Sequence, residues 1–343
     1  MSRLLSDLGI DLPVLAAPMA GGPSTPALVT AAARVGGLGF LAGGYKTAQA
    51  LAGQIHTVRA DGVPFGVNLF VPNPVPISAE AYRGYAQAVQ PEAEPYGLKL
   101  TDGDPVEDDD QWTDKVDLLT ASPVPWVSFT FGIPDRAVVG ALRRAGTTVL
   151  QNVTSTDEAR RAAEFGVDAL IVQAATAGGH SATLTPERPL TPVPLPELVG
   201  QVRDAVTLPV IATGGIATPA DVAAALHAGA EAVMVGTLLL RTDESGASAP
   251  HKTALVDPAF ETTIVTRAFT GRPARALRNH FTDRFDAIAP AGYPALHHLT
   301  GPLRKAATAA GDTRLIHLWA GTGHREARSE PAEQALARLA GRL

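Results

Sequence analysis

The sequence predicts an α/β protein built as a TIM-type (β/α)8 barrel, with a smaller, mainly helical second domain or lid. Short apolar runs alternate with segments of helical pattern, as expected when helices cover both faces of a parallel sheet. The chain carries eight such runs, which favours a closed barrel over an open sheet. Its 343 residues suffice for one large α/β domain with an appendage.

The expected barrel strands are short and are followed by helix-start signals. Thr25-Pro26 and Thr218-Pro219 each offer a capping side chain followed by proline at the first helical position. The spacing from Ser155 to Glu158 is that of a capping box. The eight expected strands are residues 14–17, 38–41, 65–69, 126–129, 148–151, 169–172, 210–213 and 232–235.

Two regions depart from this alternation and predict the second domain. Residues 72–125 are rich in proline and too long for an ordinary βα loop, and the acidic stretch 107–110 is expected to be a solvated loop. After Arg241 the alternation ends, and residues 249–343 are expected to pack against the insertion over the barrel mouth. The predicted barrel is therefore 1–72 with 125–245, and the substrate-covering domain is 73–124 with 246–343. Residues 326–343 fit either a surface helix or a frayed tail.

Composition excludes several classes of function. A net charge of -6 gives no electrostatic case for nucleic acid. The absence of cysteine excludes disulfides, thiolate metal sites and cysteine nucleophiles. The first residues lack the apolar core of a signal peptide, and prolines interrupt the apolar stretch 12–44. We therefore expect a cytoplasmic protein without membrane contact, whose partners are small molecules; a homodimer is left open.

The most informative motif is Ala-Gly-Gly-His at residues 177–180, directly after an expected strand. Two glycines before a histidine let a flat ligand approach the backbone, and an imidazole can move protons near neutral pH. Barrel active sites lie at the carboxyl ends of the strands. Candidate side chains at other strand ends are Met19, Asn68, Ser128, Gln151 and Gln173.

Glycines after the last two expected strands predict a phosphate site. Gly214, Gly215, Gly236 and Thr237 follow these strands, where backbone amides and a helix amino terminus can hold a phosphate without lysine. No metal site is expected, since the chain has no HExxH motif and adjacent histidines 297 and 298 would diverge on a helix.

Six motifs resemble the nitronate monooxygenase family, formerly called 2-nitropropane dioxygenase, and three features are closest to its class I. Those three are the Asn68 motif, the Ser128 motif and a weaker tail at residues 293–304. The motifs are Ala-Pro-Met-Ala-Gly (17–21), Gly-Gly-Leu-Gly (36–39), Gly-Val-Asn-Leu-Phe (66–70), Ser-Phe-Thr-Phe-Gly (128–132), Ala-Gly-Gly-His (177–180) and Ala-Thr-Gly-Gly-Ile (212–216).

The resemblance implies an FMN-dependent oxidation of alkyl nitronates, such as propionate 3-nitronate, by O2 to a carbonyl compound and nitrite. His180 would face the substrate, and Ser128, Tyr293 and Arg304 or Lys305 would contribute to the substrate pocket. The chain departs from the family at Thr176, where glutamate is frequent, and at residues 181–184, where another glycine is common. The implied FMN contacts are Ala17, Pro18, Met19, Asn68, Gln151, Gln173, Gly178, Gly179, Gly214, Gly215, Gly236 and Thr237.

Two other functions remain open from sequence. A flavin-dependent NAD(P)H oxidoreductase, either an enoyl-acyl-carrier-protein reductase or a quinone reductase, shares the motifs between residues 177 and 237 and resembles the tail at 261–275. A flavin-binding protein without turnover, acting as a sensor or an assembly partner, is the third hypothesis. The Asn68 and Ser128 motifs favour the monooxygenase.

Overall fold

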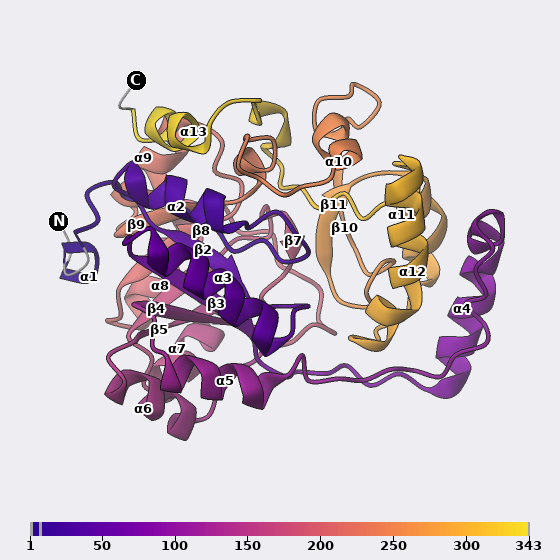
Figure 1. The fold of residues 1–343 in the computed structure, drawn as a ribbon, viewed down its shortest axis with the longest axis horizontal. Helices are drawn as coiled ribbons and strands as arrows, with labels where there is room; N and C mark the ends of the chain where they lie inside the picture. Colours follow the sequence, from indigo (N-terminus) through magenta and orange to yellow (C-terminus); the bar gives the residue numbers. More distant parts are fainter. Residues whose placement is uncertain (1–2, 7–8, 342–343) are drawn as a thin grey trace.

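Eight parallel strands close into a barrel in the computed structural model, which describes residues 3–6 and 9–341 (Figure 1). Each strand pairs with its neighbour in chain order, and the last returns to the first through Leu15 and Met234. All eight expected strands are confirmed. They are β1 (Val14–Ala16), β2 (Gly39–Ala42), β3 (Phe65–Phe70), β4 (Trp126–Thr130), β5 (Thr148–Val153), β6 (Ala169–Gln173), β8 (Val210–Thr213) and β9 (Ala232–Val235).

The expected helix starts are also confirmed. Thr25 caps α2 (Pro26–Arg34), and Thr218 forms a full capping box with Asp221 at α9 (Pro219–His227). Ser155 caps α7 (Thr156–Glu164), but the carboxylate of Glu158 turns away and accepts from the backbone and hydroxyl of Thr154. The other helices around the barrel are α3 (Ala48–Ala60), α6 (Arg136–Arg144) and α8 (Leu195–Ala205), with the short α1 (Arg3–Ser6) before β1.

We propose that the elements beside the barrel mouth form the second domain; they contain a small sheet as well as helices (Figure 1). Sequence patterning missed this sheet because its strands are only two to four residues long. It consists of β10 (Thr263–Thr266), β11 (Ala274–Leu277) and β7 (Gly179–His180), all antiparallel. The helices are α4 (Ala79–Ala93), α10 (Ala249–Ala254), α11 (His280–Phe285) and α12 (Ala295–Ala310), with single turns η1 (Glu94–Tyr96) and η3 (Asp286–Ile288).

Separate apolar cores support the division into two domains, with one adjustment to its boundary. The second core joins α4, α11 and α12 through residues such as Tyr85, Phe281 and Leu303. By contrast, α5 (Trp112–Ala121) packs against α3, α6 and β3, and α13 (Ala332–Leu339) packs against α2 and α9. We propose that α5 and α13 belong to the barrel shell. Of the two interpretations of the tail, α13 supports the helix; residues 342–343 lie outside the described part of the chain.

No helix among residues 3–6 and 9–341 combines the length and apolar character needed to cross a lipid bilayer. Within the same residues, no group of three or more histidine, aspartate or glutamate side chains is placed to bind a metal ion.

Candidate active site

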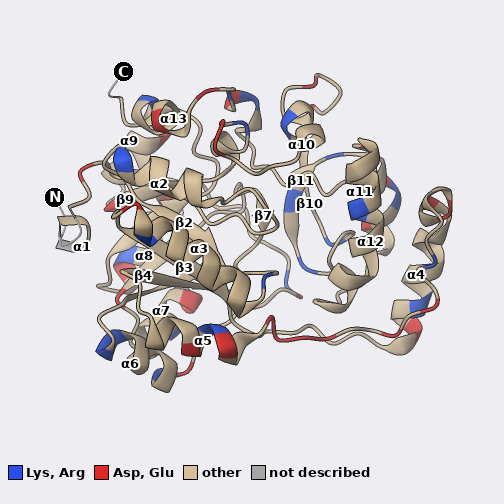
Figure 2. Cartoon of the chain, viewed as in Figure 1, with Lys and Arg blue, Asp and Glu red and all other residues tan. Residues whose placement is uncertain are grey.

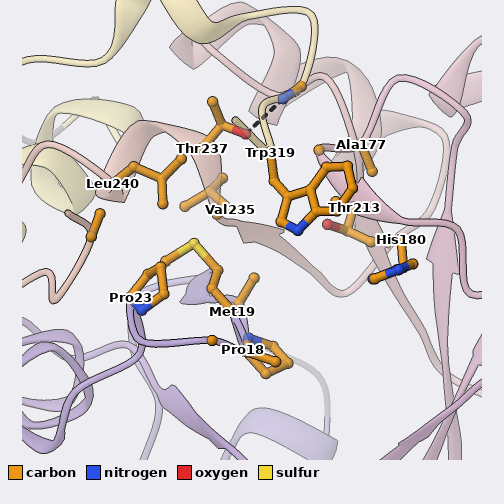
Figure 3. Close-up of a pocket in the computed structure, with 18 of the residues that line it drawn as sticks. Pro18, Met19, Pro23, Ala177, His180, Thr213, Val235, Thr237, Leu240 and Trp319 are labelled. Atoms are coloured by element: carbon orange, nitrogen blue, oxygen red, sulfur yellow. Dashed lines mark hydrogen bonds between the residues drawn. The ribbon is translucent and has the colours of Figure 1, made fainter. Parts of the chain in front are cut away.

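A pocket of about 310 Å³ lies at the carboxyl ends of the barrel strands, against the second domain. Figure 3 shows Pro18, Met19, Thr237, Trp319 and His180 around it. One side of the pocket is made of glycines and the other of aromatic side chains. We call Gly178, Gly179, Gly214, Gly215 and Gly236 the glycine end, and Tyr45, Phe70, Phe131, His180 and Trp319 the aromatic end.

Two glycines of this end, Gly214 and Gly236, lie close to neighbouring atoms. Gly214 has φ +111°, and a Cβ there would lie 2.9 Å from the backbone oxygen of Ala174. A Cβ at Gly236 would lie 3.4 Å from the Met19 sulfur, within the pocket lining. Bare backbone at both positions suits close approach by a phosphate and by a planar ring. These residues therefore fit a flavin mononucleotide.

One expected element of the phosphate site is already engaged. The carboxylate of Asp221 accepts the backbone N–H groups of Ala217 and Thr218, and its own N–H donates to the Thr218 hydroxyl, so these groups at the start of α9 are already paired. A phosphate would thus be held by the loop amides rather than by this helix. The Thr237 hydroxyl, at the start of η2 (Thr237–Leu239), accepts the N–H of Gly321 at 2.9 Å (Figure 3). This bond ties the chain after Trp319 to the barrel end.

The loop after β1 forms the floor of the pocket. Ala17 donates its N–H to Val235 of the last strand, and Met19 donates to the Ser24 hydroxyl at 2.8 Å. Ser24 in turn donates to the backbone oxygen of Ala17 at 3.3 Å. These bonds fix the loop, so the Met19 side chain is held toward the pocket (Figure 3).

His180 is positioned by both domains. It follows β6 of the barrel, yet it belongs to β7 and pairs with Ala274 of the second domain's sheet. Gln173 accepts the N–H of Ala182 at 2.8 Å and donates to the backbone oxygen of His180 at 3.3 Å. The imidazole Nε2 lies 2.9 Å from the Thr270 hydroxyl. The ring is therefore fixed from several sides.

The charge state of His180 follows from its surroundings. Burial, then the positive charges of Arg272 and Arg304, lower the pKa of His180 to about 3. The imidazole is therefore neutral near pH 7 and can accept a proton. Because the Thr270 hydroxyl donates to the backbone oxygen of Arg272, its oxygen is free to accept Nε2–H of His180. This arrangement favours the tautomer with its lone pair on Nδ1.

Two buried guanidinium groups lie behind the aromatic end. Burial lowers the pKa of Arg272 and that of Arg304 to about 10, so both stay protonated at neutral pH. Arg272 is fully buried, donates to the backbone oxygen of Thr183 and lies 4.0 Å from the centre of the Phe131 ring. Arg304 donates to the backbone oxygen of His297 at 2.8 Å. Within the described chain neither arginine forms a carboxylate ion pair, so both leave positive charge near the pocket.

The structure brings most of the expected site residues to the pocket. The twelve that line it are Ala17, Pro18, Met19, Asn68, Gln173, Gly178, Gly179, His180, Gly214, Gly215, Gly236 and Thr237.

Five expected residues do not line the pocket. Gln151 is buried and donates to the backbone oxygen of Gly132, while its neighbour Asn152 lines the pocket instead. Ser128 is buried beneath Asn68 and accepts from its amide at 2.9 Å. Lys305 is exposed on α12. Tyr293 and Arg304 lie behind the lining, and the Tyr293 ring centre is 5.8 Å from that of His180.

Sequence reasoning missed several pocket residues. Tyr45 directly follows two glycines after β2, a signal of the same kind as the one that identified His180. Trp319 begins a Trp-Ala-Gly-Thr-Gly run, which is also visible in the sequence. His251 and His317 line the pocket but carry no local pattern that separates them from surface histidines.

The fold and the site define a (β/α)8 barrel whose pocket, at the carboxyl ends of the strands, combines glycine backbone with a buried histidine. Comparison with known proteins agrees. The nitronate monooxygenase family profile matches residues 2–340. A probable nitronate monooxygenase of Staphylococcus aureus strain Newman is 35% identical over 347 residues, covering 98% of this chain and 96% of the relative.

Two solved structures extend the comparison. Nitroalkane oxidase from Streptomyces ansochromogenes has a TM-score of 0.94 and 48% identity, covering 99% of this chain and 98% of that chain. FabK from Thermotoga maritima has a TM-score of 0.77 and 27% identity, covering 100% and 96%. The chain belongs to the nitronate monooxygenase family. It is an oxidoreductase that catalyses the flavin-dependent oxidation of nitroalkanes or nitronates.

Proposed function

We propose that this protein binds FMN and oxidises alkyl nitronates, such as propionate 3-nitronate, with O2 to a carbonyl compound and nitrite. The observation that carries the proposal is the buried imidazole of His180 in the pocket lining, close to the two buried guanidinium groups of Arg272 and Arg304. The chemistry that FMN supplies when bound is the acceptance of electrons from the nitronate and their delivery to oxygen.

The protein's own residues bind and orient the substrate. A nitronate is an anion and already a carbanion equivalent, so it needs no strong base. It needs a defined orientation and a positive or hydrogen-bonding environment. Arg272 and Arg304 supply positive charge without approaching the reacting carbon, and the neutral His180 ring orients the substrate by packing beside it. With a neutral nitroalkane, Nδ1 of His180 would instead take the α-proton.

The FMN contacts would come from the glycine end and from the side chains around the floor of the pocket. The loop amides at Gly178, Gly179, Gly214, Gly215 and Gly236 would hold the phosphate and ribityl chain. The residues Ala17, Pro18, Met19, Asn68 and Gln173 would surround the ring, with Asn152 taking the place expected for Gln151. These assignments combine pocket lining with the bare backbone described above.

The experiment is anaerobic mixing of the purified FMN-loaded protein with propionate 3-nitronate and, separately, with NADPH and with NADH, followed by flavin absorbance. We expect rapid bleaching with the nitronate and slow or no bleaching with either nicotinamide. Bleaching by a nicotinamide alone would replace the proposal with the NAD(P)H oxidoreductase. The NAD(P)H oxidoreductase is included as the alternative because the chain is similar to FabK. The nitroalkane oxidase matches better in both sequence and structure.

A further inference from the structure

Backbone strain gathers at one wall of the pocket. Among the described residues, those other than glycine with positive φ are Tyr45 (63°), Asp110 (56°), Gln111 (54°) and Phe131 (79°). Bulky side chains rarely adopt this conformation, and it persists only where the surrounding structure holds it. Tyr45 and Phe131 line the pocket, and the other two residues contact the segment that carries Tyr45.

That segment is the connection between β2 and α3, and two side chains fix it from outside the barrel. The Asp110 carboxylate accepts the N–H of Tyr45 at 2.9 Å, and the Gln111 side chain accepts the N–H of Ala48 at 2.9 Å. Asp110 also lies 2.7 Å from the ammonium group of Lys115, whose side chain is only 1% exposed. The Asp110 position is thus itself anchored to α5.

The same stretch also reaches the second domain. Asp108 lies 2.9 Å from Nε2 of His298 on α12. We call residues 108–111 the strap; in Figure 2 it lies on the long acidic connection between α4 and α5. The sequence predicted a solvated loop here, which describes the exposed Glu107, Asp108 and Asp109 but not Asp110, whose side chain is only 19% exposed. The strap contacts the Tyr45 segment on one side and α12 on the other.

Tyr45 itself completes the aromatic end. Its ring stacks on that of His297, with centres 4.1 Å apart and planes at 4°. The Phe70 ring centre lies 5.3 Å away, and the Tyr45 hydroxyl accepts a hydrogen bond from that of Tyr293 at 3.3 Å. With 37% of its surface exposed, Tyr45 lies between the pocket and solvent.

We propose that Tyr45 is a specificity-determining wall of the substrate chamber, and that Asp110 and Gln111 are positioning residues that hold it there. Tyr45, Phe70 and Phe131 form a continuous aromatic surface. The substrates it fits are nitronates whose aliphatic chain extends beyond the reacting carbon. The substrate class rests on the function proposed above, whereas the role of the strap does not.

The first test compares chain lengths. With FMN-loaded protein, kcat/KM is measured for ethyl and butyl nitronate in the wild type, Tyr45→Phe and Tyr45→Ala. We expect Tyr45→Ala to lower the preference for butyl over ethyl nitronate about tenfold, mainly through KM, because contacts to one or two methylene groups are lost. Tyr45→Phe should keep the preference. An unchanged ratio in Tyr45→Ala overturns the specificity role.

The second test asks whether the strap acts through Tyr45. Gln111→Ala and Asp110→Asn should each raise KM for butyl nitronate several-fold, and neither should do so when Tyr45 is already alanine. Additive effects in the double variants would contradict the proposal. Gln111→Ala is the primary variant, because Asp110→Asn leaves Lys115 buried without its partner and could impair folding. Glu107→Gln, exposed and adjacent in sequence, is the matched control and should change nothing.

The third test needs no turnover. Amide hydrogen exchange of residues 43–48 is measured in the FMN-loaded protein. Gln111→Ala should speed exchange in this segment, and Glu107→Gln should not. If Gln111→Ala speeds exchange but the wild type oxidises no nitronate, the proposed substrate is rejected, whereas the positioning role of the strap still stands. Unchanged exchange would reject the strap whatever the substrate proves to be.

Discussion

The two ends of the pocket differ in composition: one is formed by backbone and the other by side chains. The glycine end consists of backbone at the carboxyl ends of β6, β8 and β9 and carries no titratable side chain. The aromatic end carries side chains from both domains, including Tyr45 after β2, Phe131 after β4, His180 on β7 and Trp319 before η4 (His324–Glu326). Positive φ is carried by glycines at the first end and by tyrosine and phenylalanine at the second.

The two ends of the pocket therefore have different roles. Backbone amides on a closed barrel provide a site of fixed geometry that hardly depends on pH. Side chains set the charge, the hydrogen bonding and the shape that a substrate meets, and they are tuned by burial. We therefore expect substitutions at the glycine end to change cofactor affinity, and substitutions at the aromatic end to change turnover, specificity and pH dependence.

The largest expected effect is that of His180→Asn on kcat/KM. Positioned proton transfer typically contributes 10²- to 10⁴-fold, so kcat/KM for a neutral nitroalkane should fall by about that factor. The loss for the corresponding nitronate should be smaller, because no proton has to be removed. FMN affinity should be unchanged, as measured by fluorescence titration. A loss below tenfold with both substrates would remove His180 from the chemistry.

The next largest effect is on FMN affinity, and it should distinguish a glycine of the glycine end from a glycine elsewhere in the chain. Gly214→Ala places a Cβ against the Ala174 carbonyl, whereas Gly146→Ala, also at positive φ, meets no atom within 4 Å. Both should lose about 1–2 kcal/mol of stability from the backbone conformation alone. Only Gly214→Ala should also weaken FMN binding, by tenfold or more. Equal FMN affinity in the two variants would disprove a cofactor role for this loop.

Stability should depend on pH through His251, which contacts Trp319 of the aromatic end. Burial lowers the pKa of His251 to about 4, and its Nε2 donates to the backbone oxygen of Trp319 at 3.0 Å. Below its unfolded pKa of about 6.5 the unfolded chain takes up a proton that the folded protein refuses, so stability falls as pH drops toward 4. This amounts to about 2 kcal/mol at pH 5.

The check is denaturant unfolding of the wild type and His251→Gln at pH 7.5 and pH 5. Glutamine can still donate to Trp319 but does not titrate. The variant should lose about 2 kcal/mol less than the wild type on acidification. Identical losses would show that His251 does not contribute to acid sensitivity.

The smallest effect concerns Arg272. Arg272→Met should lower kcat/KM for a nitronate about tenfold, since removing one buried positive charge near the anion costs roughly 1.4 kcal/mol. It should also raise the pKa of His180, whose depression Arg272 helps to cause. The acid limb of the pH–rate profile should therefore move to higher pH. Arg272→Lys keeps the charge and should retain most of the rate; equal rates in all three proteins would contradict the electrostatic role.

Local sequence signals sufficed for the barrel and the glycine end. Each strand was visible as an apolar run, and Thr25 and Thr218 marked the helix starts beside them. Gly214 and Gly236 could be placed in one site because the carboxyl ends of neighbouring parallel strands meet at the same edge. Strand alternation also explains the miss at Gln151: adjacent residues face opposite sides, and it is Asn152 that faces the pocket.

The aromatic end could not be predicted in the same way. Tyr45 stacks on His297 across 252 residues of sequence, a contact that no local pattern encodes. The small sheet that holds His180 pairs Gly179 with Arg275, nearly a hundred residues apart in the sequence. The acidic strap resembled a solvated loop because burial of Lys115 and contact with Tyr45 arise only when the insertion folds back.

The barrel, the glycine end and the selection of His180 as the pocket histidine could be predicted from the sequence. Each depends on short-range periodicity or on a backbone conformation that only glycine adopts readily. The tertiary structure alone decided that His180 is neutral, that Arg272 and Arg304 lie behind the pocket, and that Tyr45 closes its side. Those properties depend on burial and on contacts between distant segments, which act through space and leave no periodic trace along the chain.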